Sequence, residues 1–260
     1  MNFFRSPRRG AALPAVLALL ATASLQIPTT GRAADTGIAP FTAGDRHLPG
    51  YLDLYWSPDD ARLRIAVPTA GREAIYVNYL AGGVGSNDIG LDAGQIGDAR
   101  YVRFEVRADR VLVVQPNLRY RAESENPDEQ RAVDDAFAMS VLASLPIVAR
   151  DADRVLADAT AFAIADVHGV AHRLSARGQG SFKADADRSV VLDEALAAFP
   201  ENTVIEALLT FAGTDPGDWL REVTPTPEAV TVRIRHDFVA PPPPGYRMRR
   251  YHPRSGGFAR

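Results

Sequence analysis

Residues 51–67, YLDLYWSPDDARLRIAV, decide the fold class. Large apolar side chains alternate with other residues over Tyr51–Trp56, and the alternation returns over Arg62–Val67. This period of two is typical of strands that bury one face. Between the two segments, Ser57-Pro58-Asp59-Asp60 supplies residues that favour a turn. Two alternating segments joined by a turn predict a β-hairpin.

A second hairpin is predicted from Tyr101–Val106 and Val111–Val114, around the turn Ala108-Asp109-Arg110. Its second arm is apolar throughout, as in a strand that is buried on both faces. Further strand candidates have the same β-branched and aromatic character. They are Glu73–Ala81, Pro146–Ala149, Arg154–Ala157, Ser189–Leu192, Thr203–Phe211 and Ala229–Phe238.

Helical signals are fewer than strand signals. Asn126 has the position of a helix cap, Pro127 follows at the first helical position, and apolar residues then recur at helical spacing up to Leu142. The pattern predicts a helix over Pro127–Leu142 and a brief one over Thr160–Asp166. The sequence therefore predicts an α+β fold, a mostly antiparallel β-sheet with one or two short helices.

The N-terminus has the pattern of an export signal. Three arginines within the first nine residues precede the uncharged run Ala11–Ala23. This run is shorter than the roughly 20 residues that cross a bilayer, but it has the size of a signal peptide's hydrophobic region. Small residues favour cleavage after Ala23 or Ala33. We predict a signal peptide at residues 1–33, an exported protein in the periplasm or outside the cell, and no membrane span after cleavage.

Charge and proline divide the rest of the chain. Residues 35–240 carry 20 basic and 32 acidic groups, a net charge of −12, so we expect no nucleic-acid partner. The run Pro241–Pro244 does not fit a sheet ladder, and residues 241–260 hold five arginines and no acid. We predict a β-rich domain at 41–240 and a Pro/Arg-rich linker at 241–260. The absence of cysteine excludes disulfides, thiolate metal sites and a cysteine nucleophile.

One pair of histidines invites a catalytic interpretation but lacks a residue that the chemistry needs. His168 and His172 have the i, i+4 spacing of a helical zinc site, but Gly169 stands where such a site needs glutamate. We predict a turn and a surface helix there. The remaining histidines, His47, His236 and His252, have no partner that the sequence identifies. We therefore predict no catalytic, cofactor-binding or metal-binding residue in the chain.

The segment 82–97, GGVGSNDIGLDAGQIG, is the most unusual in the sequence. It matches no phosphate-binding, dinucleotide, nucleophile-elbow or calcium-loop pattern. Such residues satisfy their own backbone in turns, which is one interpretation. Long loops also bind partners, which makes this segment a candidate docking loop. Its candidate contact residues are Gly85, Ser86, Asn87, Asp88, Asp92 and Gln95.

Six short phrases carry a resemblance to a known family. They are Leu80–Asp92, Val114–Ala122, Phe137–Leu142, Asp166–Val170, Ala229–Arg233 and Tyr251–Phe258. In this order they resemble the N-terminal accessory domain, itself of unknown function, of bacterial exported zinc-dependent metallopeptidases of metzincin type. The resemblance runs from about Phe41 to the end. The family's His-Glu-x-x-His motif is absent from this sequence, so no catalytic or metal residue is carried over, and zinc is expected only in the missing catalytic domain.

The resemblance implies a non-catalytic accessory module, present here as a truncated or split chain. It would dock on a peptidase catalytic domain, in cis or in trans, or assist its folding, with the 82–97 loop and the Arg-rich tail as candidate contacts. The 241–260 segment would then lead towards that domain. One alternative is a free-standing envelope protein that binds peptide or glycan through the 82–97 loop. Another is a small hydrolase whose catalytic residues match no known motif.

Overall fold

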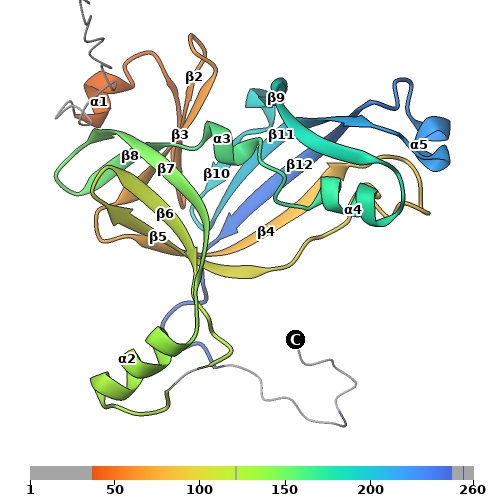
Figure 1. Cartoon of the computed structure of the whole chain (residues 1–260). Helices are drawn as coiled ribbons and strands as arrows, with labels where there is room; N and C mark the ends of the chain where they lie inside the picture. Colours follow the sequence, from red (N-terminus) through yellow and green to blue (C-terminus); the bar gives the residue numbers. More distant parts are fainter. Residues whose placement is uncertain (1–36, 121, 248–253, 255–260) are drawn as a thin grey trace, which may run out of the picture. The chain divides into compact units, whose positions relative to one another are not determined.

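The strands of this protein pair antiparallel throughout the part described, residues 37–120, 122–247 and 254 of a computed structural model (Figure 1). Twelve strands join into one sheet. They are β1 (Arg46–Leu48), β2 (Asp53–Ser57), β3 (Arg62–Pro68), β4 (Arg72–Gly82), β5 (Arg100–Arg107), β6 (Arg110–Gln115), β7 (Ser140–Arg150), β8 (Arg154–Asp158), β9 (Ser181–Val191), β10 (Ala197–Phe199), β11 (Asn202–Thr214) and β12 (Ala229–Val239).

Short helices occupy connections between the strands. Within the described residues they are α1 (Ile38–Phe41), α2 (Pro127–Ala136), α3 (Thr160–Ala163), α4 (Val170–Ala176) and α5 (Asp218–Val223), with a 3-10 turn at Asp193–Ala195. The β-rich, mainly antiparallel fold is confirmed. The helices outnumber the one or two that were predicted, because all but α2 have seven residues or fewer and give no periodic signal.

The sheet curves into a half-barrel whose two ends are tied together. Its strand order is β1-β2-β3-β8-β7-β6-β5-β4-β12-β11-β10, and β9 also pairs with β11. At one tie, the Tyr51 N–H donates to the Phe199 carbonyl (2.7 Å). At the other, the Leu52 N–H donates to Thr203 Oγ1 (2.9 Å), and the Thr203 hydroxyl donates to the Leu52 carbonyl (3.0 Å). These bonds join strands that lie far apart in the sheet order.

Two large apolar cores lie against the same sheet. The first fills the half-barrel and contains the fully buried rings of Tyr76, Phe104 and Phe238. The second contains Leu80, Phe211 and other side chains of β4, β11 and β12, which α4, α5 and the 82–97 loop cover. These three strands have 11 to 13 residues each, so they contribute to both cores.

Both predicted hairpins form. In the first, Asp53 of β2 pairs with Ala66 of β3. In the second, Arg107 of β5 pairs with Arg110 of β6 around a two-residue turn, in which Ala108 has a positive φ of 22°. Five of the remaining strand predictions fall within the longer strands β4, β7, β8, β11 and β12, and the sixth, Ser189–Leu192, runs one residue past the end of β9 at Val191.

The predicted helix over Pro127–Leu142 is wrong at its end. α2 stops at Ala136, its C-cap Phe137 has an extended backbone (φ −125°, ψ 111°), and β7 begins at Ser140. α3 occupies only the first four residues of the predicted helix over 160–166.

The two segments predicted at the ends of the chain, a signal peptide and a linker, lie mostly outside the described residues. The signal peptide at 1–33 is one of these segments, and of the linker at 241–260 only residues 241–247 and 254 are described. Among the described residues, no helix combines the length and apolar character needed to cross a membrane.

Candidate functional site

The 82–97 loop folds back on β4, which is longer than its neighbour β5. β5 pairs with β4 only over Arg72–Tyr76. Beyond that point the end of the loop takes its place: the Leu80 N–H donates to the Gln95 carbonyl (3.0 Å), and the Gly97 N–H donates to the Asn78 carbonyl (2.8 Å). The loop end therefore extends the sheet in place of a strand.

The middle of the loop covers the second core. Ile89 and Leu91 are fully buried there, and Val84 lies beside them. The Val84 N–H donates to the Leu91 carbonyl (2.8 Å). At Gly83 a Cβ would lie 2.3 Å from the Leu91 carbonyl oxygen, so only glycine fits this close approach. The loop is thus a packed part of the fold.

The six candidate docking residues lie in different environments. Gly85, Asn87 and Asp88 are exposed, Ser86 is buried, and Asp92 and Gln95 are half-buried. Gln95 lines a cavity of about 190 Å³ at the base of the loop. We call this cavity the polar pocket; its polar side chains are Asn78, Gln95, Asp98, Arg100, His168 and Arg173.

His168 lies at the centre of the hydrogen bonds in the polar pocket. Its Nδ1 is 2.8 Å from Asn78 Oδ1, and its Nε2 is 3.4 Å from Gln95 Oε1. Burial lowers the pKa of His168; Asp166 opposes this shift, whereas Arg173 and Arg100 add to it. The ring is therefore neutral at pH 7, with its proton on Nδ1, because Asn78 Oδ1 only accepts.

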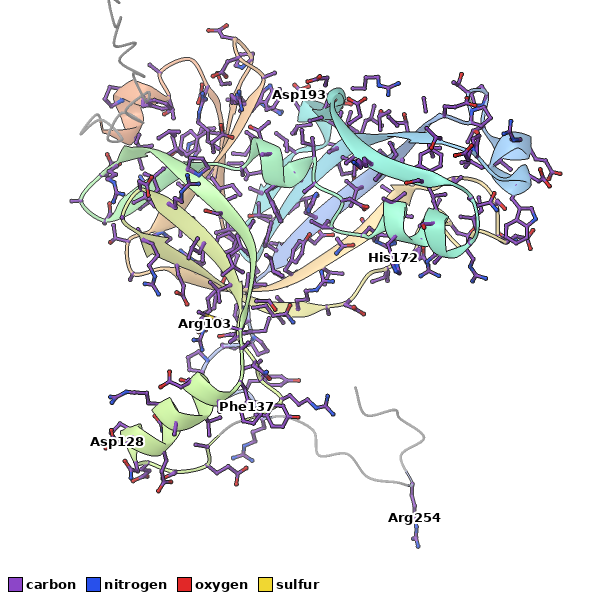
Figure 2. The ribbon with its side chains drawn as sticks, viewed as in Figure 1. Arg103, Asp128, Phe137, His172, Asp193 and Arg254 are labelled. Atoms are coloured by element: carbon purple, nitrogen blue, oxygen red, sulfur yellow. The ribbon has the colours of Figure 1, made fainter. Side chains whose placement is uncertain are left out.

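The two histidines of the zinc-like spacing do not share a helix. Gly169, in a left-handed conformation (φ 78°), separates His168 from α4, and His172 is exposed on α4 (Figure 2). In the described ranges, no three His, Asp or Glu side chains come together in a metal-binding arrangement. The surface helix was predicted, whereas the half-buried position of His168 was not.

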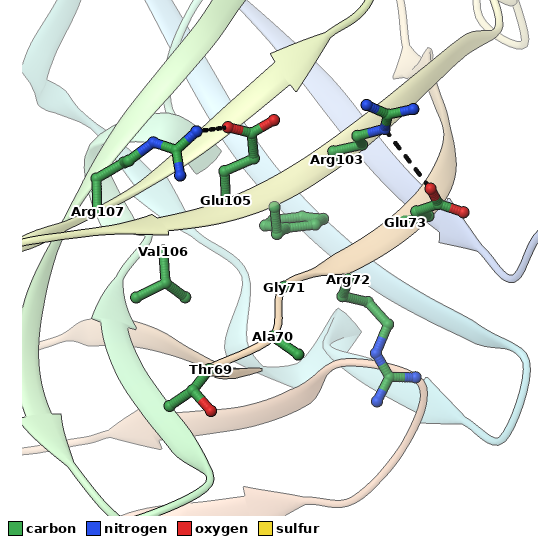
Figure 3. Close-up of a pocket in the computed structure, with 10 residues that line it drawn as sticks. Thr69, Ala70, Gly71, Arg72, Glu73, Arg103, Glu105, Val106 and Arg107 are labelled. Carbon is green, nitrogen blue, oxygen red and sulfur yellow. Dashed lines mark hydrogen bonds and ion pairs between the residues drawn. The ribbon is translucent and has the colours of Figure 1, made fainter. Parts of the chain in front are cut away.

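A larger groove of about 570 Å³ lies beside the β3–β4 turn and β5 (Figure 3). Its charged side chains are paired with one another or with a ring. Arg103 Nε lies 3.5 Å from Glu73 Oε1, and Arg107 pairs with Glu105. The Arg72 guanidinium lies over the Tyr51 ring, 4.9 Å from its centre. The groove therefore offers little unsatisfied charge to select a ligand.

An exposed apolar patch lies where α2 joins the sheet. It consists of Leu118, Tyr120, Phe137 and Met139, which are 47%, 44%, 37% and 61% exposed. The Tyr120 and Phe137 rings stack with centres 3.9 Å apart. The patch lines a cavity of about 570 Å³ together with Arg103 of β5, and Figure 2 shows Arg103 and Phe137 at this junction. In the sequence, Leu118 and Tyr120 belong to one of the resemblance phrases, and Phe137 and Met139 belong to another and to the predicted helix; no surface was predicted there.

A comparison with protein families places most of the chain in a known domain family. The model of a domain of unknown function (DUF5117) matches residues 94–260, more than half of the chain. No curated protein and no solved structure gives a significant match.

Proposed function

The chain belongs to the DUF5117 family, a domain of unknown function. On the resemblance that its six sequence phrases carry, we propose that it is a non-catalytic, exported accessory module of a zinc metallopeptidase. It acts by docking on the peptidase catalytic domain, in cis or in trans, or by assisting that domain's folding. Zinc then belongs to the catalytic domain. The site of action is the periplasm or the cell exterior, as the sequence of residues 1–33 predicts.

The apolar patch is the observation that carries this proposal. Its four large side chains are 37% to 61% exposed and lie together around one cavity. α2, which stands beside them, has no buried residue (Figure 1). Apolar side chains that cluster on a surface with polar residues around them mark interaction sites. A protein partner would bury this patch and hold α2 in place.

The position of the patch in the sheet also favours a partner joined through the C-terminal end. The chain enters the patch from β6 at Gln115, and it leaves the sheet from β12 at Val239. Ile75 of β4 pairs with both Val239 and Tyr101 of β5, so the two points lie at the same end of the sheet. β5 and β4 lie between β6 and β12 in the sheet, so Gln115 and Val239 are three strand spacings, or about 14 Å, apart.

The 82–97 loop is a weaker docking candidate than the patch. Its large apolar residues Ile89 and Leu91 point into the second core and are not available to a partner. Its exposed residues are polar or small except Ile96, so the loop presents one large apolar side chain where the patch presents four. The patch therefore replaces the loop as the main docking surface in this proposal.

Binding to a peptidase domain tests the proposal. The purified chain is titrated with a His-Glu-x-x-His peptidase domain from the same genome, and the affinity is measured by calorimetry. We expect Leu118→Asp to weaken binding at least tenfold, because it places a charge in a desolvated contact. The matched control is Val190→Asp on β9, since Val190 is 46% exposed against 47% for Leu118. Equal effects of the two variants, or no binding by the wild type, would contradict the docking role.

The isolated chain provides a second measurement. We expect the purified protein to contain no stoichiometric zinc and to leave casein intact. Zinc-dependent casein cleavage that persists through repurification would show that the chain is itself a peptidase.

The alternative of a free-standing peptide- or glycan-binding protein draws support from one observation: Gln95 of the 82–97 loop lines the polar pocket. Specific peptide or glycan binding that is lost in Asn87→Ala or Asp88→Ala, with folding intact, would favour this alternative.

A further inference from the structure

The polar pocket carries positive charge that its own acids do not neutralise. Arg100 and Arg173 both line it, and Asp98 is its one lining carboxylate among the described residues. Asp98 is 4.0 Å from Arg100 and its side chain is 91% exposed, so water and salt screen this pair. Arg173 makes no ion pair or side-chain hydrogen bond within the part of the chain that the structure describes. With His168 neutral, the lining has a net charge of about +1.

We propose that the polar pocket binds a single carboxylate group, with Arg173 and Arg100 as its cationic partners. The guanidinium group presents a planar fork of N–H donors that matches the two oxygens of a carboxylate. A carboxylate also balances a lining charge of +1, whereas a phosphate dianion would not. The site is independent of the apolar patch and of the docking function.

The pocket also has room for the group that bears the carboxylate. Its volume of about 190 Å³ exceeds that of a carboxylate alone. Ile96 and Val167 line it beside the polar side chains, and Ile96 is 71% exposed. A short aliphatic substituent can therefore contact the rim. Both the C-terminus of a peptide and a free small carboxylic acid meet this description.

Buried amides supply further polar contacts. Asn78 is 1% exposed, and its Nδ2 makes no hydrogen bond within the described residues. The Asn78 side chain also lies near the Tyr76 hydroxyl: burial raises the pKa of Tyr76, while Arg100 and the Asn78 side chain oppose the rise. The amides of Asn78 and Gln95 therefore line the pocket as neutral polar groups beside the two arginines.

Carboxylate binding is coupled to the protonation of His168. In the neutral His168 ring, Nε2 carries a lone pair and faces the Gln95 amide. Because a lone pair needs a donor, the Gln95 amide rotates by half a turn so that Nε2 of Gln95 donates to Nε2 of His168. An anion in the pocket favours the charged ring, so Nε2 gains a proton and becomes a donor. The other charged groups facing His168 are Asp166, Arg173 and Arg100, with Asp98 at the pocket lining. Of the Asp166 oxygens, Oδ1 accepts from the Val170 N–H and Oδ2 from the Ala171 N–H.

Calorimetry on the chain alone tests the site. The probes are N-acetyl-alanyl-alanine, the same peptide with a C-terminal amide, acetate, and inorganic phosphate. We expect the free acid to bind, the amide to bind at least tenfold more weakly, and phosphate to bind more weakly than the acid. Acetate that binds as well as the peptide identifies a small carboxylic acid as the source, and acetate that binds more weakly identifies a peptide terminus.

Arginine variants locate the binding. Arg173→Gln should weaken binding of the free acid at least tenfold, and Arg100→Gln serves as the second variant. Arg177→Gln, which changes an exposed arginine one turn later at the end of α4, is the matched control and should bind normally. By NMR, the free acid should raise the pKa of the His168 ring, so binding should be tighter at pH 5.5 than at pH 8. The proposal is overturned if neither carboxylate binds, if phosphate binds more tightly, or if Arg173→Gln and Arg177→Gln behave alike.

Discussion

His236 lies fully buried inside the half-barrel, between two groups that neutral imidazole satisfies. The Tyr76 hydroxyl is 2.9 Å from Nδ1, and the Ala163 carbonyl is 3.1 Å from Nε2. Because a carbonyl only accepts, Nε2 carries the proton and Nδ1 accepts from Tyr76. Burial lowers the pKa of His236 to about 4, and the bond to Ala163 opposes this only in part.

This burial predicts a loss of stability in mild acid. An unfolded histidine takes up a proton near pH 6.5, whereas folded His236 does so only near pH 4. Stability is therefore complete above pH 6.5 and falls as the pH is lowered to 4, by about 3 kcal/mol at the end of this window. His236→Gln should remove this part of the pH dependence of urea unfolding, and exposed His47→Gln should leave it in place. The same slope in all three proteins would show that His236 is not its source.

At the scale of single residues, the sequence indicated which side chains were unusual but not which of them meet. Gln95 and His168 stood out separately, and Tyr76 and His236 are 160 positions apart. Each meeting depends on long-range pairing: residues 95–97 bond to β4, and β4 lies beside β12. No local spacing contains that information.

The 82–97 loop, as an element, should contribute to stability mainly through its buried apolar residues. Ile89→Ala leaves a cavity in the second core, where Ile89 is fully buried, and we expect it to cost about 2–4 kcal/mol in the free energy of unfolding. Asp88→Ala, at the exposed neighbour, should change it by about 0.5 kcal/mol or less. Urea unfolding measures both. Similar small effects would mean that the loop does not act as a cover for the core.

Elements were predictable where burial gives a regular pattern. The two hairpins combine alternation with turn residues, and both form. The first part of β9 gives no such pattern, because Phe182 is its one buried residue before Val191. The helix prediction extended too far because Phe137, Val141 and Leu142 continue the apolar spacing, although Val141 pairs with Val114 in a strand.

For the whole molecule, Thr203 is the residue that ties the two ends of the sheet. Thr203→Val removes an acceptor from the Leu52 N–H and a donor from the Leu52 carbonyl, and Thr203 is fully buried. We expect a loss of about 1–3 kcal/mol, the cost of leaving buried polar groups unpaired. Thr214→Val, at the exposed end of the same strand, should have little effect in thermal unfolding. If the two variants unfold at the same temperature, the Thr203 hydrogen bonds do not stabilise the sheet.

The three strands that run through both cores have a consequence for how the protein is degraded. β4, β11 and β12 each lose part of their packed face if either core opens, so we expect the two cores to come apart together. A form with one intact core and one open core is therefore disfavoured. A protease therefore meets either the folded molecule or an unfolded chain, and few molecules are in a half-open form from which degradation could start.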